Sequence, residues 1–246
     1  MHDFSSIMFN GKSSSEFGLF LPISGRVVGY PAKQKVTTPV PGVNGLVDLT
    51  PYVGQTFQER QMTYSFIVAD ASMWRRADEY TTWQNVLSWL MSPSGKLPLF
   101  DNYDPNYYYL AELTQAPTLV SDGTNRFTTL TIIFDCYPFK VALQDEGSDD
   151  WDSFDFETDV AQFNKWTING SRTIDVFNVG ENTVLPQLVV TGSITIITSE
   201  GELIPLNAGT YDQQAMVSQQ VLPVGETIFE VRGQGTLQLI WHREVI

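Results

Sequence analysis

The chain has 246 residues, 42% of them hydrophobic and 17% charged, which is enough to bury the core of one large or two modest domains. Its formal net charge of −14, with no basic stretch interleaved with aromatic residues, argues against a surface that grips nucleic acid. Cys136 is the only cysteine, so an internal disulfide and a cysteine metal cluster are both excluded.

The beginning of the chain predicts no targeting segment. Met1-His2-Asp3-Phe4 lacks a basic region followed by an apolar one, and no apolar run approaches the roughly 18 residues of a membrane span. We therefore expect neither a signal peptide nor membrane insertion.

The first unusual stretch is "VPGVNGLVDLTP", from Val40 to Pro51, which holds two turn-forming pairs, Pro41-Gly42 and Asn44-Gly45. Pro followed by Gly suits a tight turn, and Asn-Gly is the commonest filling of a type I′ hairpin. By itself the pattern fits either a glycine loop that cradles a ligand or a hairpin that shapes a surface.

Most of the sequence up to residue 142 has the alternating, β-branched and aromatic pattern of half-buried strands. The clearest cases are residues 60–70, 106–115 and 126–139. Cys136 lies inside the last of these, and a buried, inert thiol is expected there. The aromatic cluster "FDNYDPNYYYL", residues 100–110, fits a core and an interface equally well.

One helix is predicted, over residues 73–91. Its apolar residues recur at intervals of three and four, Ser72 is a suitable N-cap, and Ser92-Pro93-Ser94-Gly95 ends the pattern. We expect this helix to lie against a sheet.

An acidic segment, residues 143–159, carries eight acidic side chains and no basic one. Such a charge run extends the chain, so we predict a linker between domains 1–142 and 160–246 that proteases cut first. The aspartates from Asp149 to Asp155 also suggest calcium, but the central Gly and late Glu of an EF-hand are missing. Trp151, Phe154 and Phe156 indicate that the linker docks somewhere.

After the linker, short strands are expected at regular spacing, which is typical of a small β-sandwich. They are residues 173–178, 187–191, 193–198, 228–232 and 236–241. Turns at Asn169-Gly170, at residues 179–182 and at Gly233-Gln234-Gly235 are expected to separate them.

No catalytic, cofactor or metal site is predicted. His2 and His242 are the only histidines, too few for the usual base of a hydrolase or for a histidine metal site. "GKSS" at Gly11 and "GQGTLQL" at Gly233 each lack a glycine of the phosphate-binding or dinucleotide motif they resemble, so both are expected to be turns.

The order of these features resembles the distal tail (Dit) proteins of long-tailed phages. The phrase "FSSIMFNGKSSSEFGLFL", residues 4–21, is similar to the family's opening strand, with an aromatic-Asn-Gly turn followed by Phe-Gly-Leu. "VPGVNGLVDLT" resembles its Pro-Gly-x-(Asn/Asp)-Gly hairpin, and residues 160–246 look like its galectin-like or carbohydrate-module-like sandwich. The likeness is strongest over residues 1–142.

The resemblance implies a mainly β protein: an N-terminal β-sandwich with one packed helix and an extended arm, residues 36–59, and a C-terminal sandwich. It also assigns the quoted hairpin to that arm, which reaches a neighbouring subunit. The interface residues would be Val40, Pro41, Gly42, Val43, Asn44, Gly45 and Leu46. The arm has few charges and too little apolar face to be stable alone, so pairing with another chain would satisfy its backbone.

By the same resemblance the chain would be a structural virion protein without enzymatic activity, made in the host cytoplasm and placed at the distal end of the tail. It would form a homo-hexameric ring around a channel for DNA, without binding nucleic acid specifically. Its partners would be the tail tube protein, the tape measure protein, a tail-associated lysin or tail-tip fibre, and a receptor-binding protein.

Two other functions are weighed against this one. A carbohydrate-binding module would use the second sandwich to hold host cell-surface sugar, but the residue set of a galectin site is not found there. A β-hydrolase using two carboxylates has less support, because nothing in the sequence indicates that any two carboxylates converge.

Overall fold

The computed structural model describes residues 5–69, 76–121, 127–147, 160–212 and 221–246. The chain divides into two compact units: unit 1, residues 1–140 with Ile246, and unit 2, residues 141–245. Most of the predicted acidic linker, from residue 148 to 159, lies outside the described residues. The role of the linker as a domain boundary therefore stays a prediction.

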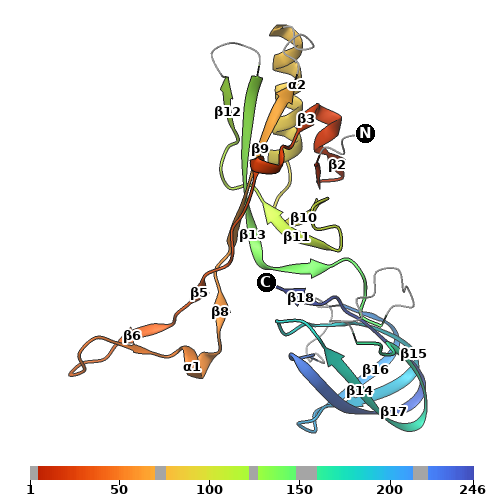
Figure 1. Cartoon of the computed structure of the whole chain (residues 1–246). Coiled ribbons are helices and arrows are strands. Elements are labelled where there is room, and N and C mark those ends of the chain that lie inside the picture. Colours follow the sequence, from red (N-terminus) through yellow and green to blue (C-terminus); the bar gives the residue numbers. More distant parts are fainter. Residues whose placement is uncertain (1–4, 70–75, 122–126, 148–159, 213–220) are drawn as a thin grey trace. The chain divides into compact units, whose positions relative to one another are not determined.

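Unit 1 is built mainly from β-strands, drawn from red to green in Figure 1. Its elements are β1 (Ile7–Phe9), β2 (Lys12–Ser13), η1 (Ser14–Phe17), β3 (Leu19–Phe20), η2 (Ile23–Gly25), β4 (Arg26–Val28), β5 (Lys33–Gln34), β6 (Thr37–Pro39), β7 (Leu46–Asp48), α1 (Thr50–Val53), β8 (Thr56–Phe57), β9 (Arg60–Ala69), α2 (Arg76–Met91), β10 (Leu97–Asp101), β11 (Tyr107–Glu112), β12 (Thr118–Ser121) and β13 (Phe127–Ala142).

The core of unit 1 follows from the alternation of β9 and β13. These strands pair antiparallel from Phe127 opposite Ala69 to Cys136 opposite Arg60. Every second side chain is buried, which gives Met62, Tyr64, Phe66 and Val68 on β9 and Leu130, Ile132, Phe134 and Cys136 on β13. The period of two places these side chains on one face, as the sequence pattern predicted.

Helix α2 covers this core with Val86, Trp89 and Leu90, all of which belong to the same buried cluster. The helix ends at Met91, before the Ser-Pro-Ser-Gly sequence that ends the apolar pattern. Its predicted N-cap, Ser72, and residues 73–75 lie outside the described residues.

The β1–β2 turn shows the type I′ conformation that an Asn-Gly pair favours. Asn10 and Gly11 have φ angles of 46° and 70°, and Phe9 pairs with Lys12 on either side of them. "GKSS" therefore begins in a turn, as predicted, and continues into β2 and η1.

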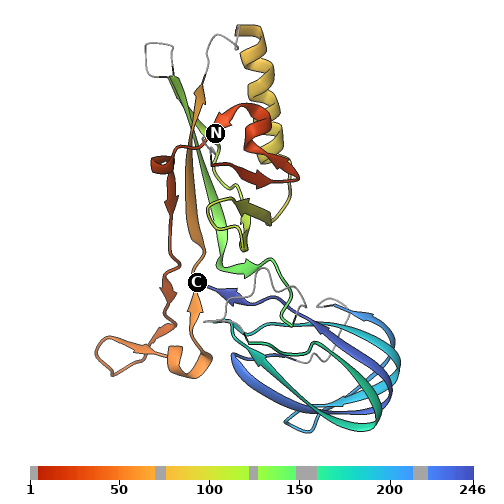
Figure 2. The same ribbon diagram turned by 45° about the vertical axis from the view of Figure 1, so that its right-hand side comes forward.

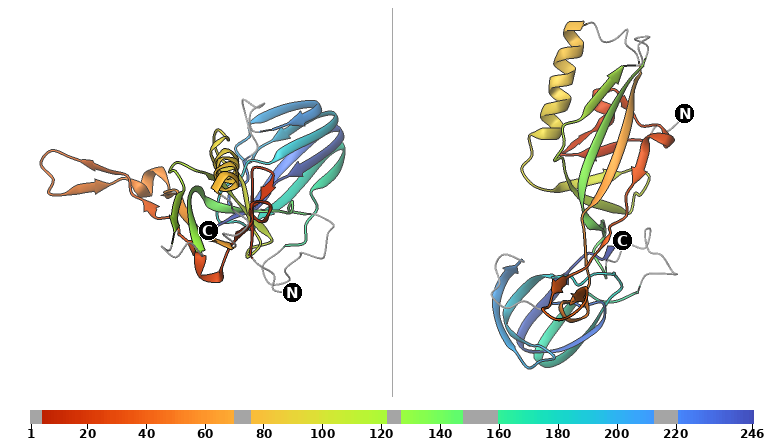
Figure 3. Two further views of the ribbon diagram at one scale, coloured as in Figure 1. Left: turned by 90° about the horizontal axis from the view of Figure 1, so that it is seen from above. Right: turned by 90° about the vertical axis from the view of Figure 1, so that its left-hand side faces the viewer.

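In the described part of unit 2, four strands form an antiparallel sheet in the order β14-β17-β15-β16. Its long strands are β14 (Lys165–Asn178), β15 (Gln187–Ile197), β16 (Leu203–Tyr211) and β17 (Gly225–Ile240), and β18 (Glu244–Val245) follows them. Each strand curves along its length (Figure 3). Side chains from both halves of the long strands, such as Ile168 and Ile174 of β14, meet in one core.

Two predicted turns are wrong, and the reason is the glycine row that bends this sheet. Gly170 pairs with Gly233, and Gly192 pairs with Gly235, so the glycines lie side by side within continuous strands. Asn169-Gly170 and Gly233-Gln234-Gly235 are therefore bends inside β14 and β17. A Cβ at Gly192, Gly233 or Gly235 would lie 2.2, 2.3 or 1.7 Å from a backbone oxygen of the neighbouring strand, so these three positions require glycine, whereas a Cβ at Gly170 would meet nothing within 4 Å.

Candidate functional site

The predicted interface residues, Val40 to Leu46, form the end of a hairpin that extends from unit 1 (Figure 1, Figure 2). β6 and β7 pair from Thr37 opposite Asp48 to Pro39 opposite Leu46. The Val43 amide donates to the Val40 carbonyl at 3.2 Å, and Gly42 between them has a φ of 84°. The Pro41-Gly42 turn is therefore present as predicted.

The second predicted turn has a different form. A type I′ turn needs positive φ at both central residues, and in the described part of the chain Asn10 is the only non-glycine residue with positive φ. Asn44-Gly45 is therefore no type I′ turn, although Gly45 has a φ of 86°. The hairpin instead closes through a longer loop, residues 40–45, in which Pro41-Gly42 already reverses the chain.

The arm, residues 36–59, has no core of its own. None of its residues is buried, and the arm is joined to the preceding chain where β8, within the arm, pairs with β5 through Phe57 and Lys33. Val43 is 52% exposed, Leu46 64% and Tyr52 86%. A short hairpin with this much apolar side chain in water gains little stability from burial within the chain.

The root of the arm, in contrast, is fixed to the sheet of unit 1. Lys96 places its ammonium 2.7 Å from a Glu59 carboxylate oxygen and 2.8 Å from one of Glu112. The rings of Phe57 and Phe139 meet edge to face, with centroids 5.4 Å apart. These contacts hold the residues where the arm returns to β9, so the exposed end is carried on an anchored base.

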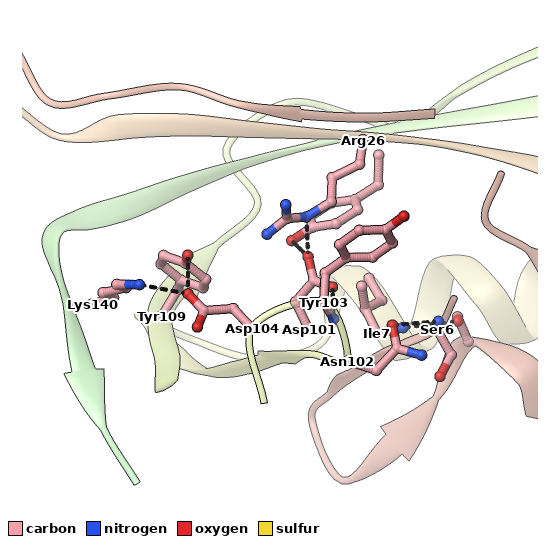
Figure 4. A network of polar contacts seen from close by, with 11 residues as sticks. Ser6, Ile7, Arg26, Asp101, Asn102, Tyr103, Asp104, Tyr109 and Lys140 are labelled. Carbon is pink, nitrogen blue, oxygen red and sulfur yellow. Dashed lines mark hydrogen bonds and ion pairs between the residues drawn. The ribbon is translucent and has the colours of Figure 1, made fainter. Parts of the chain in front are cut away.

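A buried polar network, which the sequence analysis missed, ties β4, β9 and β10 together (Figure 4). The Asp101 carboxylate, fully buried, accepts hydrogen bonds from Arg26, from the Tyr64 hydroxyl at 2.9 Å and from the Tyr103 amide at 3.0 Å. Its position after the apolar run "LPLF" was the only signal in the sequence.

The electrostatics of this network are those of a structural ion pair. Burial disfavours the Arg26 cation, but the charge and hydrogen bond of Asp101 outweigh it and raise the pKa of Arg26. Burial, and then the Asp101 charge, raises the pKa of Tyr64 well above its ordinary range. Both Asp101 oxygens accept hydrogen bonds from the strands and the turn around them, so this carboxylate links parts of unit 1 that are far apart in the sequence.

Asp101→Asn is expected to lower the free energy of unfolding by about 3 kcal/mol, because Arg26 would keep its charge without a buried counter-charge. Urea unfolding measures this effect. Asp48→Asn is the control, since Asp48 is paired with Lys35 at 3.8 Å on the exposed arm and should contribute little. Equal effects of the two substitutions would contradict the assignment.

Cys136 is fully buried on β13, as predicted. Burial raises the pKa of its thiol to about 12 from an ordinary value of 9.0. The folded chain therefore keeps a proton that the unfolded chain releases above pH 9.0, so the free energy of unfolding falls as the pH rises through this window.

This group alone is expected to contribute a slope of about −1.4 kcal/mol per pH unit between its two pKa values. Urea titrations of the native protein and of Cys136→Ala at pH 9 to 10 measure the contribution of the thiol. Above pH 10 Tyr109, whose pKa burial raises to about 12, adds to the slope. Parallel pH profiles for both proteins would contradict this expectation.

The other chemistry-bearing residues do not converge. His242 lies in unit 2, with Nε2 3.1 Å from Asp145 and Nδ1 3.2 Å from the Gln144 carbonyl, and His2 lies outside the described residues. Among the residues that the structure describes, no group of three His, Cys, Asp or Glu side chains could hold a metal ion. The aspartates of the calcium alternative, residues 149–155, fall outside this part.

Of the helices in the described ranges, none combines the length and apolar character needed to cross a bilayer.

The whole chain shares its fold with the SPP1 Dit protein (gp 19.1), described as a paradigm of the hub adsorption apparatus in phages that infect Gram-positive bacteria. The two align over 98% of this chain and 99% of that one, with a TM-score of 0.64 and 14% sequence identity. The fold is thus mainly β and Dit-like.

A chain of the phage p2 baseplate, in its activated conformation with Sr, aligns over 98% of this chain and 97% of that one at 10% identity. Its TM-score of 0.37 is too low to establish a shared fold. No protein-family model and no curated protein matches the sequence.

Proposed function

We propose that the chain is a distal tail protein of a long-tailed phage, a structural component of the virion without enzymatic activity. The observation that carries the proposal is the fold shared with the SPP1 hub protein over nearly the full length of both chains. A structural match to one domain alone would show only that the two proteins share that domain. The match to the SPP1 protein instead includes both units of this chain.

In this proposal six copies form a ring that joins the tail tube to the tail tip and leaves a channel for DNA. A closed ring of identical subunits needs two different surfaces that fit each other. The arm supplies one, with the exposed residues Val40 to Leu46 at its end. Its backbone and apolar side chains would contact a second copy of the chain.

The sheet of unit 1 offers further contact surfaces on two sides. β4 pairs with β9, and β12 pairs with β13 at the other side of the β9–β13 pair. Both carry exposed apolar residues, such as Val27 on β4 and Val120 on β12. The arm lies between β4 and β9 in the sequence. In the proposed ring, the arm and the β4 edge of one copy would therefore contact the β12 edge of the next copy.

Tail tube protein, tape measure protein, a tail-associated lysin or fibre and a receptor-binding protein are the proposed partners, at the distal end of the virion tail. Sedimentation equilibrium of the purified chain tests the assembly. We expect six times the chain mass of 27.6 kDa. A concentration-independent single-chain mass would contradict the proposed ring.

The alternative, a carbohydrate-binding module, needs an aromatic ring whose face is open to a sugar. In the described part of unit 2, Trp166 and Trp241 are both buried in the core. Phe163 is 80% exposed but lies outside the sheet, before β14, and Phe177, near the end of β14, is 41% exposed. These observations favour a structural role for unit 2.

The proposed channel also carries a prediction about DNA. Residues 1–142 hold ten basic and twelve acidic side chains, and the whole chain has a net charge of −14. We expect no measurable binding of duplex DNA in a fluorescence titration, even at low ionic strength where attraction is screened least. Micromolar binding that weakens steeply with added salt would show that basic side chains form a DNA-binding groove.

A further inference from the structure

Unit 1 contains a cleft of about 330 Å³ that belongs neither to the arm nor to the Asp101 network. It lies between the β1–β2 turn, η1 and the C-terminal half of α2. Its lining residues are Asn10, Lys12, Phe17, Asn85, Ser88, Trp89 and Ser92. All of them lie in the described part of the chain.

The walls of the cleft are fixed to each other without a ligand. The Asn10 side-chain amide donates to the Trp89 carbonyl at 3.2 Å, and the Trp89 indole donates to the Phe9 carbonyl at 2.6 Å. The Phe17 ring stacks on Trp89, with centroids 4.8 Å apart and an angle of 22°. These contacts hold the β1–β2 turn and η1 against α2, so the backbone that carries the lining side chains is fixed.

The polar groups in the cleft are cationic or neutral. Lys12 supplies an ammonium, Asn85 an amide and Ser88 a hydroxyl, whereas the Asn10 amide already donates to the Trp89 carbonyl and the Ser92 hydroxyl, and no carboxylate lines the walls. Asn85 and Ser88 are three residues apart, so α2 presents them on one face, and Ser92 follows directly after the end of the helix. Among the ion pairs of the described residues, none includes Lys12.

The aromatic residues of the cleft are not arranged for a sugar. Phe17 has one face on Trp89, and the Lys12 ammonium lies 5.8 Å from the centre of its ring. Trp89 is only 3% exposed. A sugar ring therefore finds no free aromatic face, whereas an anion can meet the ammonium and several hydrogen-bond donors together.

We propose that this cleft binds an acidic side chain carried by a loop of a partner protein. The carboxylate pairs with the Lys12 ammonium and accepts hydrogen bonds from the Asn85 amide and the Ser88 hydroxyl. The volume is at the lower end of ligand sites and suits one side chain with its adjoining backbone. The site lies outside the arm, so it does not depend on the proposed ring.

Fluorescence anisotropy of the full chain with a labelled peptide tests the proposal. The probe is Ser-Glu-Gly-Ser, amidated and carrying an uncharged dye at its amino end, and the matched probe is Ser-Gln-Gly-Ser. We expect the glutamate peptide to bind about tenfold more tightly, the size of a charge-assisted contact. Equal binding of the two peptides, or no binding of either, would overturn the proposal.

Substitutions then locate the contact. Lys12→Met should remove the preference for glutamate, and Lys33→Met, which removes an exposed lysine of β5, should leave it unchanged. Asn85→Ala with Ser88→Ala keeps Lys12 but removes two donors, and both residues are exposed, so the fold should tolerate the change. If the double variant still bound the glutamate peptide about tenfold more tightly than the glutamine peptide, Lys12 alone would account for the preference, and the proposed site would be refuted.

A competition experiment shows whether the cleft binds any small carboxylate or a carboxylate carried by a peptide. Free sodium acetate that displaces the peptide at an equal concentration would show a small-anion site and overturn the assignment to a protein segment. Displacement only by glutamate-containing peptides supports it.

Discussion

Leu46→Asp is expected to convert the assembled protein into single chains. Leu46 is 64% exposed at the start of β7, within the hairpin that we propose contacts a second copy. In that contact the new carboxylate would be buried without a partner, which costs about 3 to 5 kcal/mol per interface. Light scattering measures the mass, and circular dichroism checks that the β-content is unchanged.

Leu203→Asp is the matched control. Leu203 is also 64% exposed, but it lies on β16 of unit 2 and is no part of the arm. The same change of side chain at the same exposure should leave the assembly intact. An unchanged assembly in Leu46→Asp would refute the proposed role of the hairpin, and dissociation in both variants would place contacts in unit 2 as well.

Gly235→Ala is expected to unfold unit 2 or destabilise it by about 3 kcal/mol or more, since overpacking and an unfavourable backbone conformation add to each other. A Cβ at this position would lie 1.7 Å from the Thr191 carbonyl oxygen, and Gly235 has a φ of 154°. Backbone atoms of β15 would have to move, which disrupts the paired glycines that bend the sheet. Urea unfolding followed by circular dichroism measures the loss.

Gly209→Ala separates this effect from the general cost of replacing a strand glycine. Gly209 lies on β16, and a Cβ there would meet nothing closer than a Tyr211 ring atom at 3.7 Å. We expect its stability to stay close to that of the native protein. Similar losses at positions 209 and 235 would mean that the glycine row is not what shapes the sheet.

The sequence predicted the parts of the fold that depend on local periodicity. Alternation over residues 60–70 and 126–139 predicted β9 and β13 as half-buried strands, because a strand repeats every two residues. Cys136 was expected to be buried, and it is. Pro41-Gly42 was expected to turn, since its backbone preferences act within four residues.

The sequence alone could not distinguish the bends within the strands of unit 2 from turns between strands. Glycine at residues 170, 233 and 235 permits a reversal of the chain and also a close approach of two strands, and only the pairing of strands distinguishes these cases. Register is set by contacts between residues far apart in the sequence. The predicted short strands were therefore halves of longer ones.

The polar network around Asp101 was missed for a similar reason. Arg26 and Asp101 are 75 residues apart, and neither has a local pattern that indicates a partner. The arm root depends equally on distant contacts, such as Lys96 with Glu59. In contrast, the likeness of the chain to the distal tail family rests on short motifs in a given order, which can be read from the sequence without knowing which strands pair.

Negative-stain images of the purified chain test the central claim most directly. The proposed hub predicts particles with sixfold symmetry and a central hole, formed by the chain without other tail proteins. Separate single-chain particles, at concentrations where a stable ring would persist, would contradict the proposed function while leaving the Dit-like fold unaffected.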